Sequence, residues 1–394
     1  MTKKEKVTLV LNWTKNILIQ IPLIVFFTFA FGTVYSNTFV DKIPMVIVDY
    51  DNSSTSRTII KQFDESQGFK ITEYANSDSE MRELILRKKV SAGLVIPKYF
   101  KKNISDQDAP KTLFVVDGTN LVVGNNAFAY GSEILNTLNA GVQLKVLEGK
   151  GMVPYEAMKS LTSMNFVQRT VYDPQMSYMK YLMFGIIGIM IQQTVLSVLA
   201  PMLIEDKRKM VNIKLRSKAG IIWLGRVVAQ ITMVIILAII GFTSCFYVIC
   251  KYYNLPLRGS VQNNLILLLV FILDIIAVCF VLASIFRKVL PCVQLCMFLS
   301  VPSILTCGYV WPAFMMPTGL IEKVNLVWPI GAFINPLRDI NIKGTDYLGI
   351  LPYIKSGLRY AAIWIPIGIG FYIFRIYMDK LIEKKKAKHL ITTP

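Results

Sequence analysis

The sequence LILLLVFILDIIAVCFVLASIF, residues Leu265–Phe286, is an apolar run that contains one charged residue, Asp274. A helix of this length would be about 33 Å long, and the hydrocarbon layer of a bilayer is roughly 30 Å thick. Apolar runs of this length are typical of transmembrane helices. The run therefore predicts a membrane-spanning helix with a carboxyl group near its middle.

Five further apolar runs lie on either side of this one. They are Asn16–Val40, Tyr181–Ile204, Val227–Cys250 and Val289–Met316, which contain no charged residue, and the shorter Tyr360–Phe374, which lies between Arg359 and Arg375. The last run would reach about Gly357–Met378 if both arginines extended their side chains toward the headgroups. The chain is 54% hydrophobic, which is too apolar for an ordinary soluble protein. We therefore predict a polytopic α-helical membrane protein with six transmembrane helices.

The basic residues predict the orientation of these helices. They gather in residues 1–15, in the connections 205–224 and 287–288, and in the tail 379–394. With six helices these segments fall on one side, and loops rich in lysine and arginine stay in the cytoplasm, so both termini are predicted to be cytoplasmic. Residues 1–15 are expected to lie in the membrane interface. The net charge of +18 then reflects topology, and no nucleic-acid binding is expected.

A polar segment, residues 41–175, separates the helix at 16–40 from the five-helix region 178–378. Its short apolar runs and alternating patterns predict an extracytoplasmic α+β domain. The expected strands are Pro44–Tyr50, Phe69–Tyr74, Val90–Ile96, Lys111–Asp117 and Phe166–Tyr172, and helices are expected near 51–64, 81–89 and 123–148. The domain has no cysteine and no catalytic cluster, so we expect no disulfide, no bound metal and no enzyme activity.

Residues that break helices gather after the fifth apolar run. Gly308, Pro312, Met316 and Pro317 have the spacing Gly-x-x-x-Pro-x-x-x-Met-Pro, and Pro329 lies nine residues before Arg338. Non-helical backbone at membrane depth must be buried in protein or line water. The segment near 312–340 is therefore either a re-entrant element within the protein or an outer loop with an amphipathic helix.

This organisation resembles the permeases of the ABC-2 type exporter family over the whole chain. The shared features are the order of one helix, an outer α+β domain and five helices, the VDYDNS sequence at Val48–Ser53, the LVIPKYF sequence at Leu94–Phe100, and the glycine–proline–methionine spacing described above. The resemblance implies short re-entrant helices near 312–340, where the substrate would leave. It also implies a multi-pass protein of a bacterial cytoplasmic (inner) membrane that moves an amphipathic or hydrophobic substrate outward.

The resemblance further implies that ATP and Mg²⁺ bind to a separate ABC ATPase subunit. This chain has no phosphate-binding loop, because Lys150 in Gly149-Lys150-Gly151 is not followed by serine or threonine. The other implied partners are a second permease copy or a related permease, membrane lipids and envelope export proteins. No cofactor is expected on this chain itself.

The connection after the second apolar run matches in position the segment with which family members contact the ATPase. The candidate coupling residues are Glu205, Asp206, Lys207, Arg208 and Lys209. Family members often continue with Gly-Thr, whereas this chain continues with Met210-Val211. A solvated basic loop that only sets the topology is the alternative.

Polar residues near the middle of the helices form a third candidate site. A carboxylate at the bilayer centre is costly, so Asp274 should face protein or water. Gln192 and Gln193 lie at similar depth in the second apolar run, and we hypothesise that one of them donates a hydrogen bond to Asp274. A place on the substrate path and a proton-coupling role are the alternatives to this structural role.

A non-transporting surface protein, such as a receptor, an adhesin or a secretion-machine component, is the main alternative function. Some such proteins share the order of one helix, an outer region and five helices, but usually with a much longer outer region. The sequence does not identify the substrate.

Overall fold

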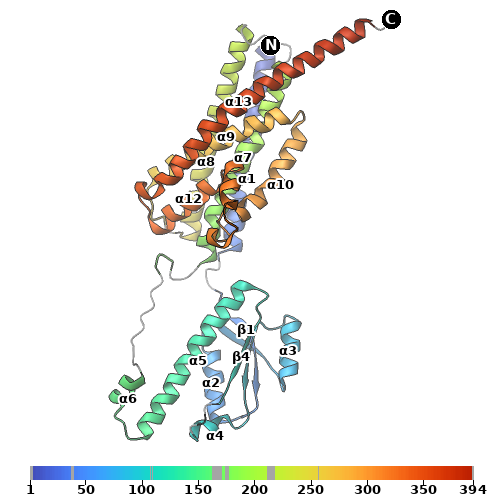
Figure 1. Ribbon diagram of the computed structural model, residues 1–394. Helices are drawn as coiled ribbons and strands as arrows, with labels where there is room; N and C mark the ends of the chain where they lie inside the picture. The colour runs from blue at the N-terminus through green and yellow to red at the C-terminus, as the bar shows by residue number, and fades with distance from the viewer. Residues whose placement is uncertain are drawn as a thin grey trace. The chain divides into compact units, whose positions relative to one another are not determined.

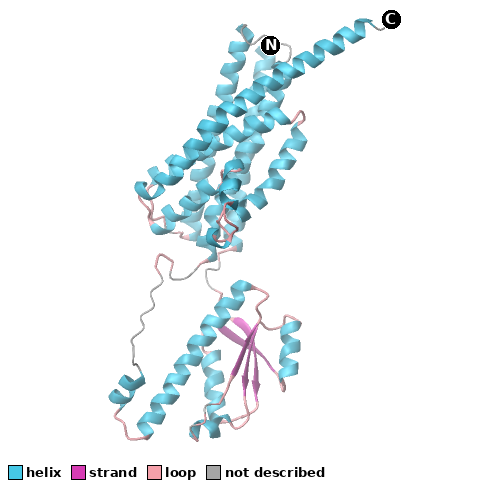
Figure 2. Cartoon of the chain, in the orientation of Figure 1, coloured by secondary structure: helices cyan, strands magenta, loops and turns pink. Residues whose placement is uncertain are grey.

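The computed structural model describes residues 3–36, 40–106, 108, 110–161, 171–173, 177–210, 218–255 and 257–392. The chain divides into two compact units, which Figures 1 and 2 show as a helical bundle and a smaller unit that contains a sheet. The bundle comprises Met1–Thr38 and Thr170–Pro394, and the smaller unit comprises Phe39–Arg169.

The helical unit consists of long helices and a group of short ones. The long helices are α1 (Lys3–Val34), α7 (Tyr178–Met210), α8 (Lys218–Tyr253), α9 (Val261–Ile285), α10 (Val289–Thr306) and α13 (Tyr347–Thr392). The short helices are η1 (Ala313–Met315), α11 (Leu320–Val327) and α12 (Gly331–Lys343). Within the described residues, α7, α8, α9, α10 and α13 are long and apolar enough to cross a membrane, while the apolar part of α1, Ile19–Val34, is shorter.

Two helices differ in length from their apolar runs. The run Val289–Met316 was expected to be one span, but α10 ends at Thr306 because Gly308 adopts a positive φ of 82°, a conformation that glycine accepts readily at helix ends. The run Tyr360–Phe374 was expected to be short, yet it is part of the 46-residue helix α13. Polar residues at both ends of α13 hid its length, since apolar runs mark only the part of a helix that lipid or protein covers.

The core of the helical unit is centred on α9, which packs most extensively against α13 and α7. Aromatic rings connect α9 to the short helices, because Phe271 stacks on Phe333 of α12 with ring centroids 4.2 Å apart. Glycines on α7 make the close approach of α12 possible. A Cβ atom added at Gly188 would overlap the Cγ2 of Ile334 in α12.

The smaller unit contains a four-stranded sheet in the order β2-β1-β3-β4. The strands are β1 (Ile43–Asp49), β2 (Phe69–Tyr74), β3 (Ala92–Ile96) and β4 (Leu113–Val116), and the helices are α2 (Ser54–Asp64), α3 (Asp78–Leu86), α4 (Phe100–Ser105), α5 (Leu121–Gly149) and α6 (Pro154–Leu161). Strand β1 is parallel to β2 and β3, and β4 is antiparallel to β3. The first four predicted strands are confirmed. The fifth, Phe166–Tyr172, lies mainly outside the described residues, and its described end, Val171 and Tyr172, is not in a strand.

Alternate residues of β1 enter two separate apolar cores. Met45 and Ile47 belong to a core that includes residues of α2 and α5, whereas Val46 and Val48 belong to a core with Met81 of α3. Successive side chains of a strand point to opposite faces, so helices cover both faces of the sheet. This burial explains why PMVIVDY is a continuous apolar run that alternation alone would not identify.

Candidate functional site in the helical unit

The segment between α10 and α12 is broken at the residues that the sequence singled out. Gly308 ends α10 with a positive φ, and Gly319 has a φ of 77° just before α11. Pro312 precedes η1, Met316 ends it in an extended conformation, and Pro329 lies between α11 and α12. We call residues 307–330 the broken segment. Pro336 lies inside α12 and does not end that helix.

Tyr309 anchors the broken segment on the first turns of α7. Its side chain is 1% exposed. Its hydroxyl donates to the carbonyl of Tyr181 and accepts a hydrogen bond from the amide of Gly185 at 2.9 Å, the two groups that a regular α-helix joins directly. In return, the Tyr181 hydroxyl donates to the carbonyl of Tyr309 at 2.6 Å. The two tyrosines therefore attach the broken segment to α7 by reciprocal hydrogen bonds.

Arg338 of α12 completes this anchor. Its guanidinium carbon lies 4.6 Å from the ring centroid of Tyr309 and 5.1 Å from that of Tyr181. One of its nitrogens also donates to the Tyr309 carbonyl at 3.4 Å. A cation over aromatic faces is attracted by the negative potential of the rings. The structure therefore brings Arg338 to Tyr309, the residue after Gly308. Among the described residues, no hydrogen bond or ion pair joins Arg338 to Pro312, Met316 or Pro317.

The candidate coupling residues at the other end of α7 divide into two groups. Glu205, Arg208 and Lys209 are exposed, whereas Asp206 and Lys207 are each 1% exposed. Asp206 and Lys207 thus do not present their charges at the surface, and direct contact with a partner remains a prediction for Glu205, Arg208 and Lys209. The helical period places these two on the face of α7 that is buried in the bundle.

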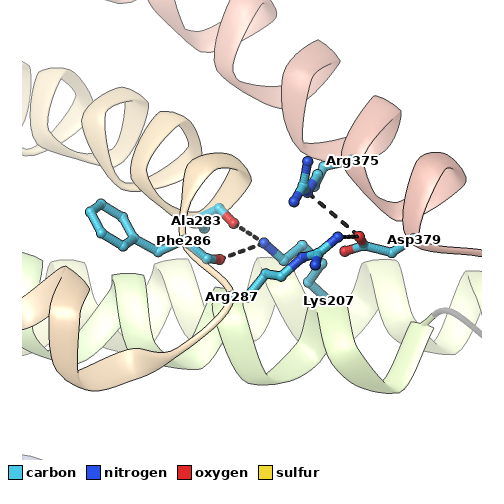
Figure 3. Close-up of polar contacts among 6 residues, drawn as sticks. All are labelled: Lys207, Ala283, Phe286, Arg287, Arg375 and Asp379. Carbon is cyan, nitrogen blue, oxygen red and sulfur yellow. Dashed lines mark hydrogen bonds and ion pairs between the residues drawn. The ribbon is translucent and has the colours of Figure 1, made fainter. Parts of the chain in front are cut away.

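Both buried charges have partners on other helices. Asp206 accepts a hydrogen bond from Gln230 of α8 at 2.8 Å and lies 3.5 Å from the guanidinium of Arg226. Lys207 donates to the carbonyls of Ala283 and Phe286 at the end of α9 (Figure 3), the latter at 2.7 Å. Consecutive residues of α7 therefore attach it to α8 and to α9.

The hypothesised hydrogen bond between Asp274 and a glutamine is not present. Gln192 instead accepts a hydrogen bond from the indole of Trp328 at 3.0 Å. Asp274 is 1% exposed, and its Oδ1 has no hydrogen-bond partner among the described residues. Its other oxygen faces Gly357 of α13, where an added Cβ atom would lie 3.0 Å from Oδ2. Trp328 does not block that bond, because the indole uses the Oε1 of Gln192 while the amide nitrogen has no partner among the described residues. Similar depth in two helices therefore did not bring the carboxyl and the amide within hydrogen-bonding distance.

The chain matches the family described as "ABC-2 family transporter protein" over residues 15–374. This match covers most of the chain and includes α7 to α12. The chain belongs to this family. A relative, the "ABC transporter G family member 20" of Dictyostelium discoideum, is 24% identical over 169 residues, which is 41% of this chain and 19% of that protein. The chain therefore matches about a fifth of the relative's length.

Membership of the ABC-2 family makes the chain a membrane component of a transporter. In this ABC-2 protein, the anchor at Tyr181, Tyr309 and Arg338 and the charges at Asp206 and Lys207 lie at opposite ends of α7. Tyr181 and Lys207 are separated by roughly 39 Å along a regular helix. Sequence reasoning missed both tyrosines, although an arginine and two aromatic residues beside broken backbone are a usable signal of a cation–aromatic contact.

Asp274→Asn is expected to leave the ABC-2 protein folded and to raise its melting temperature in detergent by about a few degrees. The carboxyl is buried without a partner for Oδ1, so an amide of the same shape removes the cost of burying an ionisable group. Thermal unfolding of the purified variant tests this. If the variant melts lower than the unmodified chain, the carboxyl of Asp274 has a stabilising partner and the structural account is wrong.

Proposed function

We propose that this chain is the permease subunit of an ATP-driven exporter, which moves an amphipathic or hydrophobic substrate from the cytoplasm or the inner leaflet outward. Family membership is the observation that carries the proposal. A separate ABC ATPase subunit would bind ATP and Mg²⁺, and a second permease copy would complete the membrane pathway. The chain would cross the membrane six times, with both termini in the cytoplasm and the unit Phe39–Arg169 outside.

The distribution of charge over the helical unit supports this orientation. Figure 3 draws Lys207 of α7, Arg287 after α9, and Arg375 of α13 side by side. Basic residues at the ends of α7 and α9 thus lie beside a basic residue of α13, as expected for a cytoplasmic side. The broken segment is attached to the opposite end of α7, where a substrate would leave the protein.

The exposed residues at the end of α7 are the proposed contact with the ATPase. Glu205, Arg208 and Lys209 present two positive charges and one negative charge to solvent. Asp206 and Lys207 lie between these residues in the sequence but are buried, and they hold α7 rigidly to the bundle. A push on the exposed side chains would therefore move α7 together with the helices that it contacts.

The double substitution of Arg208 and Lys209 by glutamate is expected to separate the two subunits. The ATP-binding subunit that co-purifies with the tagged chain in mild detergent would fall about tenfold or more, because charge reversal replaces attraction by repulsion at the contact. Quantitative pull-down followed by an ATPase assay measures both binding and activity. Lys355→Glu, which changes an exposed lysine on α13, is the matched control.

The outcome of the pull-down decides between two functions. A stoichiometric ATP-binding subunit that is lost on charge reversal and kept in the control would support the exporter. A chain that purifies without an ATPase in every detergent tested would contradict it and would favour a surface protein on the same membrane scaffold.

A further inference from the structure

A buried lysine joins α7 to the end of α9. The ammonium group of Lys207 lies within hydrogen-bonding distance of two carbonyls of the last turn and cap of α9, those of Ala283 and Phe286. The last carbonyls of a helix have no partner within the helix and carry partial negative charge. Lys207, at 1% exposure, therefore adds from α7 a side-chain donor to the end of α9.

The turn that follows α9 is also held by α13. Arg287 donates to Asp379 of α13 at 2.8 Å, and Arg375, one turn earlier in α13, lies 3.6 Å from the same oxygen (Figure 3). The Arg287 side chain is 58% exposed, whereas that of Asp379 is 17% exposed. The turn between α9 and α10 is thus fixed on one side by Lys207 and on the other by Asp379.

Helix α10 connects this turn to the broken segment. It begins at Val289, directly after the turn, and its last residue, Thr306, is followed by the Gly308 bend. Its packing within the bundle is mainly against α7, and its buried residues, Cys292, Cys296, Ser300 and Ser303, are all small. Its other face is exposed at Leu290, Met297, Phe298, Val301 and Leu305. Packed helices can slide past one another by small amounts, and the turn and the Gly308 bend at the two ends of α10 would then carry the displacement.

We propose that the α9–α10 turn transmits movement of α7 to the broken segment, and that Lys207 is the positioning residue that makes this transmission possible. The inference rests on the proposed function, because ATP binding to the partner subunit would move α7. Movement of α7 would carry Lys207, the end of α9 and the turn with it. Helix α10 would then pass the displacement to Gly308 and to the Tyr309 anchor.

The two contacts of the turn differ in how readily they can break. Lys207 is buried, so separation from its carbonyl partners would leave an ammonium ion in a poorly solvated site at a high cost. The contact of Arg287 with Asp379 is partly exposed, and Arg375 stays beside Asp379 when Arg287 is lost. We therefore expect loss of Lys207 to affect transmission more strongly than loss of Arg287.

The experiment reads movement of the broken segment without a known substrate. Phe314 in η1 is 87% exposed, so Phe314→Cys provides a site for a water-soluble maleimide. The labelling rate is measured with and without ATP in the complex of the full chain with its co-purifying ATPase, against the same chain without Phe314→Cys. The experiment compares three variants, which are Lys207→Met, Lys207→Arg and Arg287→Gln. The matched control is Lys288→Met, which changes the exposed residue next to Arg287.

In the unmodified complex we expect ATP to change the labelling rate by about tenfold, a coupling typical of linked sites. Lys207→Met should continue to hydrolyse ATP while this effect falls to no more than about twofold. Lys207→Arg, which keeps a charged donor, and Lys288→Met should retain the effect. Arg287→Gln should reduce it partially, and this exposed position keeps the test valid if Lys207→Met does not fold.

Three results would overturn the inference. The first is an ATP effect in Lys207→Met equal to that in the unmodified complex, and the second is an unchanged effect in Arg287→Gln when Lys207→Met does not fold. The third is active ATP hydrolysis without any ATP effect on labelling in the unmodified complex. Absence of a co-purifying ATPase would instead contradict the proposed function, so the two failures are distinguishable.

Discussion

Gly188→Leu is expected to lower the melting temperature of the purified chain by about 5 °C or more and to abolish the ATP effect on the broken segment. A side chain at Gly188 would overlap Ile334 and press on the ring of Phe333 in α12. These two residues are 0% and 1% exposed, so neither can move into solvent. Overpacking of this kind costs roughly 1–3 kcal/mol, and relief requires α12 to leave α7.

Displacement of α12 would also move Arg338 away from the tyrosine anchor, which is why we expect a functional effect beyond the loss of stability. Gly370→Leu is the matched control, because an added Cβ atom at Gly370 of α13 meets no atom within 4 Å. Thermal unfolding in detergent and maleimide labelling at Phe314→Cys measure the two effects. Equal melting temperatures for the two leucine variants would show that α12 does not require the space at Gly188.

Apolar runs predicted the long helices well where hydrophobicity and helix length coincide. Leu265–Phe286 lies almost entirely within α9, because that helix is covered over nearly its whole length by lipid or protein. Val289–Met316 failed as a single span because an apolar run records burial and not backbone conformation. The Gly308 bend inside it depends on one residue, and no change in polarity marks its position.

The candidate site was predictable only in part. Gly308, Pro312 and Pro329 act through the backbone of their own residues, so spacing in the sequence was sufficient to find the broken segment. The partners of Arg338 and Lys207 are distant in sequence, and Lys207 is held by backbone carbonyls, which leave no signal in the amino-acid sequence. One local clue was available, because Leu203, Lys207 and Met210 continue the buried face of α7 at helical spacing.

The same face of α7 explains why a run of charges can contain both contact residues and structural ones. Charged side chains at the end of a transmembrane helix are usually solvated, and this expectation was extended to all five residues from Glu205 to Lys209. The bundle continues past the apolar run, however, and it surrounds Asp206 and Lys207. The limits of the apolar run therefore underestimate the length of the packed core at this end of the protein.

Asp206→Ala is expected to be the most destabilising of these substitutions, at about 3–5 kcal/mol, which corresponds to a fall of roughly 10 °C in melting temperature. The carboxylate is buried and accepts a hydrogen bond from Gln230, which is 0% exposed, and it faces Arg226. Alanine would remove the charged acceptor from Gln230 and leave a cavity between α7 and α8. Asp206→Asn should lose less stability, because an amide oxygen can still accept the hydrogen bond from Gln230 while only the ionic attraction to Arg226 disappears.

The exposed neighbour supplies the control, since Glu205→Ala should change the melting temperature by no more than about 1–2 °C. Thermal unfolding of the three purified variants should therefore rank Asp206→Ala below Asp206→Asn and both below Glu205→Ala. If Asp206→Ala instead had the same melting temperature as Glu205→Ala, the contact between α7 and α8 would not depend on the buried charge. The rigid movement of α7 with the bundle would then lose its structural basis.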